Sequence, residues 1–182
     1  EVVIADGGST DRTREVIRAF AAEHTELELK LVDNPRRIIP AALNTAVRAS
    51  SHEIILRLDA HSIPDVDYVE RAVQVLEETE AANAGGLWKI APGADTWIAR
   101  SIAAAAGHFL GAGDARYRIH GKAGPVDTVP FGVFSRKWMR KAGEFNEDLL
   151  TNEDYEYNVR LRKAGGTIWF DPEIQSTYLA RS

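Results

Sequence analysis

Residues 53–65, which read EIILRLDAHSIPD, constrain the fold of this chain more than any other stretch. The apolar run from Ile54 to Leu58 contains β-branched residues and stops abruptly, which is typical of a strand buried on both faces of a parallel sheet. Asp59 and His61 follow at once. Ligands of open α/β sheets bind beyond the carboxyl ends of strands, so an extended Asp-x-His would project both side chains toward one divalent cation or sugar-phosphate group. The open alternative is that Asp59 caps a turn while His61 is merely exposed.

Short apolar runs alternate with amphipathic stretches along the whole chain. We expect strands near residues 1–5, 27–31, 53–58, 85–90, 129–134 and 167–170. We expect helices after Asp11, from Pro40, after Asp65, over residues 98–110, from Ser135 to Gly143 and over residues 153–164. Strands that alternate with helices favour an α/β/α sandwich with a largely parallel, mixed central sheet.

The composition narrows the class of protein. With 45% hydrophobic and 27% charged residues, the chain has ordinary globular values, and we expect residues 1–182 to form a single domain. A net charge of −5 gives no electrostatic reason to expect a nucleic acid partner. The chain has no cysteine, which excludes disulfides and thiolate metal sites and fits a reducing compartment. Glu1 opens directly as a strand with no Met before it, so we expect a fragment that lacks its first strand–helix unit.

Carboxylates stand out at three points of the sequence: Asp6, Asp59 and the pair Glu153-Asp154. Asp6 lies in the turn DGGSTD, where it can accept hydrogen bonds from a nucleobase or ribose, or close an Asx-turn. Asp6 and Asp59 both follow buried strands, so we expect them along one edge of the sheet. Glu153 and Asp154 open a helix, whose dipole favours ionised carboxylates, and an ionised Asp can take a proton from a hydroxyl nucleophile. Ordinary helix-start chemistry is the alternative for that pair.

Residues 111–127 differ from the rest of the chain because glycine alternates there with basic residues. The glycines are Gly111, Gly113, Gly121 and Gly124, and the basic residues are Arg116, Arg118, His120 and Lys122. We expect a mobile loop that closes over a phosphate group, as lids commonly do.

Taken together, these motifs resemble those of the inverting family 2 glycosyltransferases of the GT-A fold. ADGGSTDRT is similar to that family's VDDGSTDxT turn, RLDAHS stands in the place of its Asp-x-Asp motif, and TNEDYEYNVRLRKAG is similar to its ED-x-x-x-x-x-RL-x-x-x-G helix. The segment VDTVPFGVFSRKWMRKAGEFNEDL most resembles the succinoglycan glucosyltransferase-like branch. The resemblance covers nearly the whole chain and implies a GT-A-like sandwich.

The resemblance also implies roles for individual residues in donor binding. Asp6 would bind the uracil of a UDP-sugar, and Asp59 would bind the ribose or the donor sugar. His61, with Asp59, would hold a divalent metal in place of the family's second Asp, and an imidazole ligand favours Mn²⁺ over Mg²⁺. Arg160 or Arg162 would bind a negatively charged phosphate group.

On the acceptor side, Asp154 would be the general base and Glu153 would shape the site. The sequence departs from the family pattern at His61, which replaces a carboxylate, and at Leu43, where many relatives carry an Arg. Relatives also have a strand, a loop and a helix before the segment that begins here.

These features lead us to expect a cytoplasmic enzyme, in the full-length protein at the inner face of a membrane, with membrane association only through segments outside this chain. Its partners would be a nucleotide-sugar donor and a saccharide or lipid-linked saccharide acceptor in polysaccharide biosynthesis. Two alternatives stay open: a non-catalytic saccharide-binding module or inactive remnant, and a sugar nucleotidyltransferase. The second would need a glycine-rich stretch with a basic residue near its N-terminus, and these residues contain none.

Overall fold

The structure, a computed structural model, describes residues 1–106, 108, 117 and 121–180. The chain forms two compact units, Glu1–Glu53 with Gly143–Glu153, and Ile54–Ala142 with Asp154–Ser182. Most of the predicted basic loop, residues 111–116 and 118–120, lies outside the described residues.

The first unit is built on two parallel strands. Strands β1 (Val2–Asp6) and β2 (Leu29–Asp33) pair in register from Val2 with Leu29 to Asp6 with Asp33. Helix α2 (Ile39–Ala49) packs against both strands, and Pro40 lies in its first turn, where the missing N–H needs no partner. These three elements confirm the expectations from the sequence.

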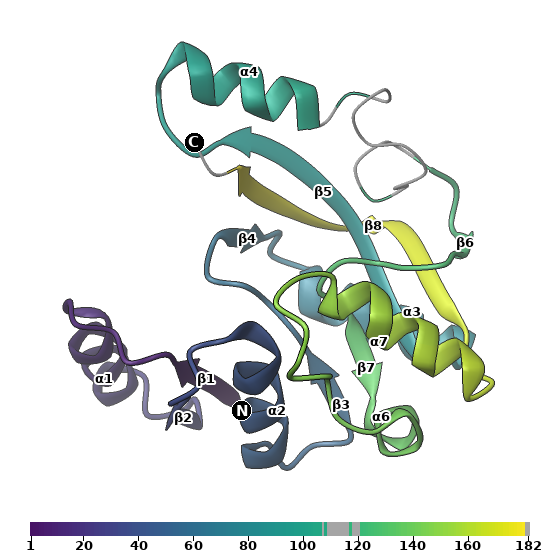
Figure 1. Cartoon of the computed structure of the whole chain (residues 1–182), viewed down its shortest axis with the longest axis horizontal. Coiled ribbons are helices and arrows are strands. Elements are labelled where there is room, and N and C mark those ends of the chain that lie inside the picture. The colour runs from purple at the N-terminus through teal and green to yellow at the C-terminus, as the bar shows by residue number, and fades with distance from the viewer. Residues whose placement is uncertain (107, 109–116, 118–120, 181–182) are drawn as a thin grey trace. The chain divides into compact units, whose positions relative to one another are not determined.

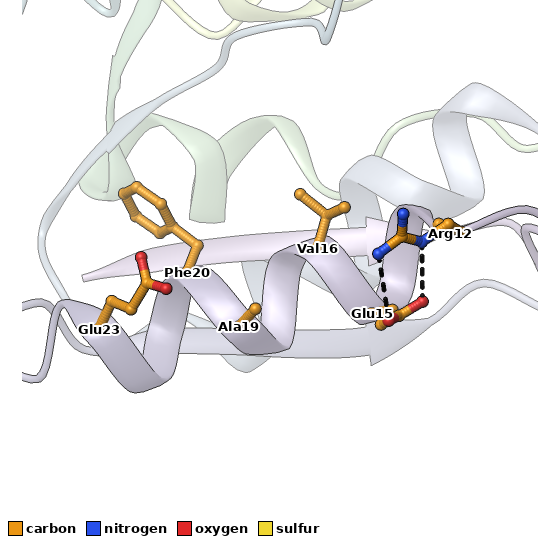
Figure 2. Close-up of a pocket in the computed structure, with 6 residues that line it drawn as sticks. All are labelled: Arg12, Glu15, Val16, Ala19, Phe20 and Glu23. Atoms are coloured by element: carbon orange, nitrogen blue, oxygen red, sulfur yellow. Dashed lines mark hydrogen bonds and ion pairs between the residues drawn. The ribbon is translucent and has the colours of Figure 1, made fainter.

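Helix α1 (Thr13–Glu23) begins where Asp11 accepts a hydrogen bond from the Thr13 backbone N–H at 3.0 Å. None of its residues is buried. Figure 2 shows the open pocket along this helix, which Val16 and Phe20 line together with the Arg12–Glu15 ion pair. Val16 is 58% and Phe20 45% exposed, so the apolar side of the helix stays largely uncovered in this unit.

The second unit is built on a six-stranded mixed sheet. Its order is β3-β7-β5-β8-β4, with β6 paired to β8. The strands are β3 (Ile54–Leu56), β4 (Ser62–Pro64), β5 (Asn83–Pro92), β6 (Gly124–Pro125), β7 (Val133–Ser135) and β8 (Ile168–Ala180). Strands β5 and β8 run parallel and side by side (Figure 1), while β7 is antiparallel to β3 and β5, and β8 is antiparallel to β4 and β6.

Within the described residues of this unit, four helices accompany the sheet: α3 (Tyr68–Thr79), α4 (Trp97–Ala106), α6 (Arg136–Ala142) and α7 (Glu153–Lys163). Tyr68, Ala72 and Val133 belong to one buried cluster between α3 and the sheet. The Phe134 ring instead contacts Tyr157 of α7, with centroids 5.9 Å apart. Because consecutive strand residues point to opposite faces, α3 and α7 cover opposite faces of β7. The predicted α/β/α sandwich with a mixed sheet is therefore confirmed.

Two of the predicted strands differ from the expectation in their length or pairing. The strand at residues 54–56 is shorter than predicted and pairs with antiparallel β7. Strand β8 continues through Pro172, where the sequence suggested an end, because the register between β5 and β8 shifts there. The shift lies between Gly85, which pairs with Phe170, and Leu87, which pairs with Gln175. A bulge of this kind tolerates a proline that has no N–H to donate.

Within the described ranges, no helix combines the length and the apolar character that a membrane span requires.

Candidate functional site

The centre of the candidate site is Arg57, which follows β3 and is only 7% exposed. Its backbone N–H donates to the Gly132 carbonyl oxygen at 3.0 Å, which extends the pairing of β3 with β7 by one residue. Its guanidinium donates from Nε and Nη2 to the two carboxylate oxygens of Asp59, at 3.0 and 3.2 Å. Nη1 donates to Oδ1 of Asp154. One buried cation thus binds two of the carboxylates that the sequence singles out.

Asp59 opens a tight turn. Its carbonyl oxygen accepts hydrogen bonds from the Ser62 backbone N–H at 3.0 Å and from the Ser62 hydroxyl at 2.7 Å. The expected extended Asp-x-His conformation is therefore wrong, because the turn that leads into β4 bends the chain between Asp59 and His61. Of the alternative, in which Asp59 caps a turn, the turn is present, but the backbone carbonyl of Asp59 forms it and the carboxylate binds Arg57 instead.

His61 is half-buried and packs among aromatic rings. Its ring lies edge-on to Tyr178 at 4.7 Å between centroids and to Phe131 at 6.4 Å. Tyr178 in turn stacks on Trp88, with centroids 4.3 Å apart and planes within 5°. The expectation of a merely exposed His61 is therefore wrong. The imidazole lies beside an aromatic cluster that we define as Trp88, Phe131 and Tyr178.

The first two residues of α7 differ in exposure. Glu153 is buried, at 7% exposed, whereas the side chain of Asp154 is 29% exposed and pairs with Arg57. The boundary between the two compact units falls between these residues. The carboxylate of Asp154 therefore has partial access to solvent and is paired with a buried cation.

Arg160 and Arg162, the predicted phosphate contacts, are both engaged within their own unit. Arg160 binds Glu156 through two hydrogen bonds of 2.7 and 2.9 Å and donates to the Ala142 carbonyl oxygen at 2.6 Å. Arg162 donates to Asp127 at 2.9 Å, while its buried Nε has no partner in the described structure. Contact with a phosphate would require these ion pairs to open.

Asp6 belongs to the first unit, where its carboxylate is already well satisfied. It accepts hydrogen bonds from the Gly8 and Ser9 backbone N–H groups, from the Ser9 hydroxyl at 2.5 Å and from Arg14 at 2.7 Å. The Ser9 hydroxyl and then the Arg14 guanidinium lower the pKa of Asp6 from 3.8 to about 2. The Asx-turn that the sequence left open is therefore present.

The expectation that Asp6 and Asp59 lie along one sheet edge is wrong. Within the described residues, β1 pairs with β2 alone, whereas the strand before Asp59 belongs to the six-stranded sheet.

The described residues contain no cluster of three or more His, Cys, Asp or Glu side chains that could hold a metal ion. Asp59 and His61 could supply at most two ligands by themselves. Mn²⁺ and Mg²⁺ sites in nucleotide enzymes are commonly completed by substrate phosphates and water, so two protein ligands are compatible with such a site.

Comparison with known proteins decides the family. Residues 1–143 match the model described as Glycosyl transferase family 2. The chain belongs to this family. It is 33% identical over 187 residues to the succinoglycan biosynthesis protein ExoA of Rhizobium meliloti (strain 1021), in a match that covers 100% of this chain and 54% of that protein. The chain spans a little over half the length of this protein and of a second curated relative, from Methanococcus voltae.

Solved structures show the same fold as this chain. The mannosyltransferase PcManGT from Pyrobaculum calidifontis, in complex with GDP-Man and Mn²⁺, superposes with a TM-score of 0.75 at 22% identity, covering 100% of this chain and 48% of that chain. S. aureus TarS 1-349, in complex with UDP-GlcNAc, gives 0.70 at 16% identity, covering 100% of this chain and 50% of that chain. The GT-A-like fold expected from the family 2 motifs is thereby confirmed.

Two features of this family 2 chain escaped the sequence analysis. Arg57 interrupts an apolar run. Because a charged residue is seldom buried without a partner, its position in the sequence indicates a buried ion pair. The aromatic cluster gave no such signal, because its three residues lie on three separate segments of the chain.

Proposed function

We propose that this chain carries the catalytic residues of an inverting glycosyltransferase that uses a nucleotide-sugar, by resemblance a UDP-sugar. The observation that carries the proposal is that Asp154 and Asp59 both pair with Arg57, because this brings together two carboxylates that family 2 motifs contribute. The family assignment supports the reaction class. The UDP-GlcNAc and GDP-Man bound to proteins of the same fold support a nucleotide-sugar donor.

Asp154 is proposed as the general base. Its carboxylate accepts the proton of the acceptor hydroxyl while that oxygen forms a bond to the anomeric carbon of the donor sugar. The bond between the anomeric carbon and the diphosphate oxygen breaks, and its electron pair leaves with the diphosphate. Attack from the face opposite the leaving group inverts the anomeric configuration. The partial exposure of Asp154 leaves room for an acceptor hydroxyl to approach.

We propose that Asp59 and His61 would hold a divalent metal. The carboxylate of Asp59 has about four lone-pair positions, of which Arg57 uses two, so acceptor capacity remains. His61 would add an imidazole nitrogen, which suits Mn²⁺ better than Mg²⁺. When bound, the metal would neutralise the charge of the departing diphosphate.

The remaining predicted residues keep supporting roles in the proposal. Glu153, buried at the start of α7, would shape the acceptor site rather than move a proton. Asp6 would accept a hydrogen bond from uracil if Ser9 yields one of its own, and Arg160 or Arg162 would meet phosphate if its ion pair opens.

The acceptor and the location belong to the proposal as well. By resemblance the acceptor is a saccharide or a lipid-linked saccharide in polysaccharide biosynthesis, and one relative is named for succinoglycan biosynthesis. We place the reaction in the cytoplasm, which agrees with a chain that has no cysteine.

The direct test is sugar transfer. A protein that contains these residues, and a longer version of it, are incubated with UDP-glucose or UDP-GlcNAc and an oligosaccharide acceptor, with and without Mn²⁺. We expect Mn²⁺-dependent release of UDP and a product of inverted anomeric configuration by NMR, with Asp95→Asn, an exposed carboxylate on another segment, as the active control. Saccharide binding without UDP release from the longer protein would favour the non-catalytic binding module instead.

A further inference from the structure

Arg57 is buried and charged, and its backbone is held in place. A residue that only fills space at the end of a strand does not need a charge. A strand end at this place could be filled by an apolar side chain, yet the chain buries a cation there. Burial of a charge is unfavourable unless the charge is paired and hydrogen-bonded. Arg57 meets that condition through Asp59 and Asp154, the two carboxylates assigned above to the donor side and to the base.

The guanidinium has little freedom to move. The backbone of Arg57 is tied to Gly132 at 3.0 Å, and its Cζ lies 5.9 Å from the centroid of the Phe131 ring. Three of its nitrogens bond to carboxylates, Nε and Nη2 to one and Nη1 to the other. The planar fork of an arginine therefore fixes the orientation of both carboxylates relative to each other, which the single ammonium of a lysine cannot do.

We propose that Arg57 is a positioning residue for the transfer reaction, which holds the Asp154 base and the donor-side Asp59 in one rigid ion-paired unit. The inference rests on the proposed function and adds a residue that the family motifs did not assign. Proton transfer and attack depend on the geometry of the base, and a misplacement of about 1 Å can reduce a rate about 100-fold. Arg57 acts through the two carboxylates and does not itself touch the reacting atoms.

The test replaces Arg57 by Lys in the sugar-transfer assay. Arg57→Lys keeps the positive charge but loses the fork, so we expect kcat to fall about 10- to 100-fold. If the loss arises through the base, the two substitutions are not additive. The double variant Arg57→Lys/Asp154→Asn should therefore have a kcat within about threefold of that of Asp154→Asn alone. A second readout, independent of turnover, is the affinity for UDP with Mn²⁺, which Arg57→Lys should weaken through Asp59 and Asp154→Asn should leave unchanged.

Arg71→Lys is the matched control, since Arg71 lies in the same unit and pairs with a different carboxylate, that of Asp171, at 3.5 Å. It should leave kcat and UDP affinity unchanged whatever it does to the melting temperature. If Arg57→Lys does not fold, Arg57→Gln replaces it, because the planar amide of glutamine keeps one donor group in a smaller side chain. Arg57→Gln should show the same loss of kcat and of UDP affinity.

The outcomes separate the inference from the function on which it rests. An active wild type whose Arg57 variants keep kcat and UDP affinity within about twofold, while melting earlier like Arg71→Lys, overturns the inference alone. Full additivity of Arg57→Lys and Asp154→Asn in kcat also overturns it, because it means that Arg57 does not act through the base. A wild type that transfers no sugar from any nucleotide-sugar refutes the proposed function, and the inference falls with it.

Discussion

At the scale of single residues, the environment separates side chains that look equivalent in the sequence. Glu153 and Asp154 are adjacent carboxylates at one helix start, yet the first is buried and the second is partly exposed beside Arg57. The sequence could place both on α7, because a helix start with acidic residues is a local pattern. It could not find the ion pair of Arg57 with Asp154, since the partners are 97 positions apart.

The first residue-scale prediction concerns the contribution of Asp6 to stability at low pH. The pKa of Asp6 is lowered in the folded state from 3.8 to about 2, so the ionised carboxylate stabilises the fold above pH 3.8. This contribution is lost as the pH falls from about 4 to about 2. We expect Asp6→Asn to flatten the dependence of the melting temperature on pH in that window.

Glu1, in the same unit, also has a pKa lowered to about 2 and titrates in the same range. The informative quantity is therefore the difference between wild type and Asp6→Asn, with Asp148→Asn, an exposed carboxyl, as control. A pH profile of Asp6→Asn parallel to that of the wild type would contradict the assignment.

The second residue-scale prediction concerns His61. His61→Phe keeps an aromatic ring against Tyr178 but removes both nitrogens, so we expect an unchanged melting temperature and a weaker affinity for Mn²⁺ in the presence of UDP. Calorimetry with Mn²⁺ and Mg²⁺ measures it, and the preference for Mn²⁺ should shrink in the variant. His52→Phe, at an exposed position, is the control. Equal Mn²⁺ affinity in His61→Phe and wild type would remove His61 from the metal site.

At the scale of helices and strands, the sequence predicted the elements that have a long hydrophobic pattern within one stretch of the chain. Helices α2 and α3 have apolar residues at helical spacing, and both form where expected. Strands β4 and β6 have three and two residues and exist only through their pairing with β8, which no local pattern encodes. The continuation of β8 past Pro172 likewise depends on its distant partner β5.

The element-scale prediction concerns Gly86, at the register shift between β5 and β8. A Cβ at this position would lie 1.8 Å from the Ile174 carbonyl oxygen, and that backbone cannot move without separating the two strands. We expect Gly86→Ala to lower the free energy of unfolding by about 3 kcal/mol or more in urea titrations, at the upper end of overpacking costs. Gly7→Ala, whose nearest neighbour would be 3.8 Å away, should cost far less. Similar unfolding curves for both variants would contradict this account of the bulge.

At the scale of the whole molecule, each compact unit includes a segment from a distant part of the chain. In the first unit, Asn44 of α2 binds the backbone of Phe145 in both directions, at 2.9 Å to its carbonyl oxygen and at 2.8 Å from its N–H. Asn44 is 3% exposed, so water cannot easily replace these bonds. The sequence could not predict this attachment, because the helical position of Asn44 says nothing about a partner 101 positions away.

We therefore predict that Asn44→Ala loosens the segment Gly143–Glu153 and leaves the second unit intact. Two buried backbone groups of Phe145 would lose their partners, at a cost of about 1–3 kcal/mol each. Hydrogen exchange should become faster at Phe145 and stay unchanged in β5 and β8. Leu150→Ala, at a position of the same segment that is 74% exposed, is the control. Uniformly faster exchange across both units would show that they do not behave separately.

The central claim is that Asp154 is the base of a sugar-transfer reaction, and the turnover of Asp154→Asn against Glu153→Gln tests it most directly. Both variants keep the size of the side chain and remove its charge. With a nucleotide-sugar donor and a saccharide acceptor, we predict that kcat of Asp154→Asn falls by about 10²- to 10⁴-fold, the usual range for general acid–base catalysis, while donor affinity is retained. Glu153→Gln should lose much less. Near-normal turnover in Asp154→Asn together with abolished turnover in Glu153→Gln would contradict the account and name the other carboxylate as the base.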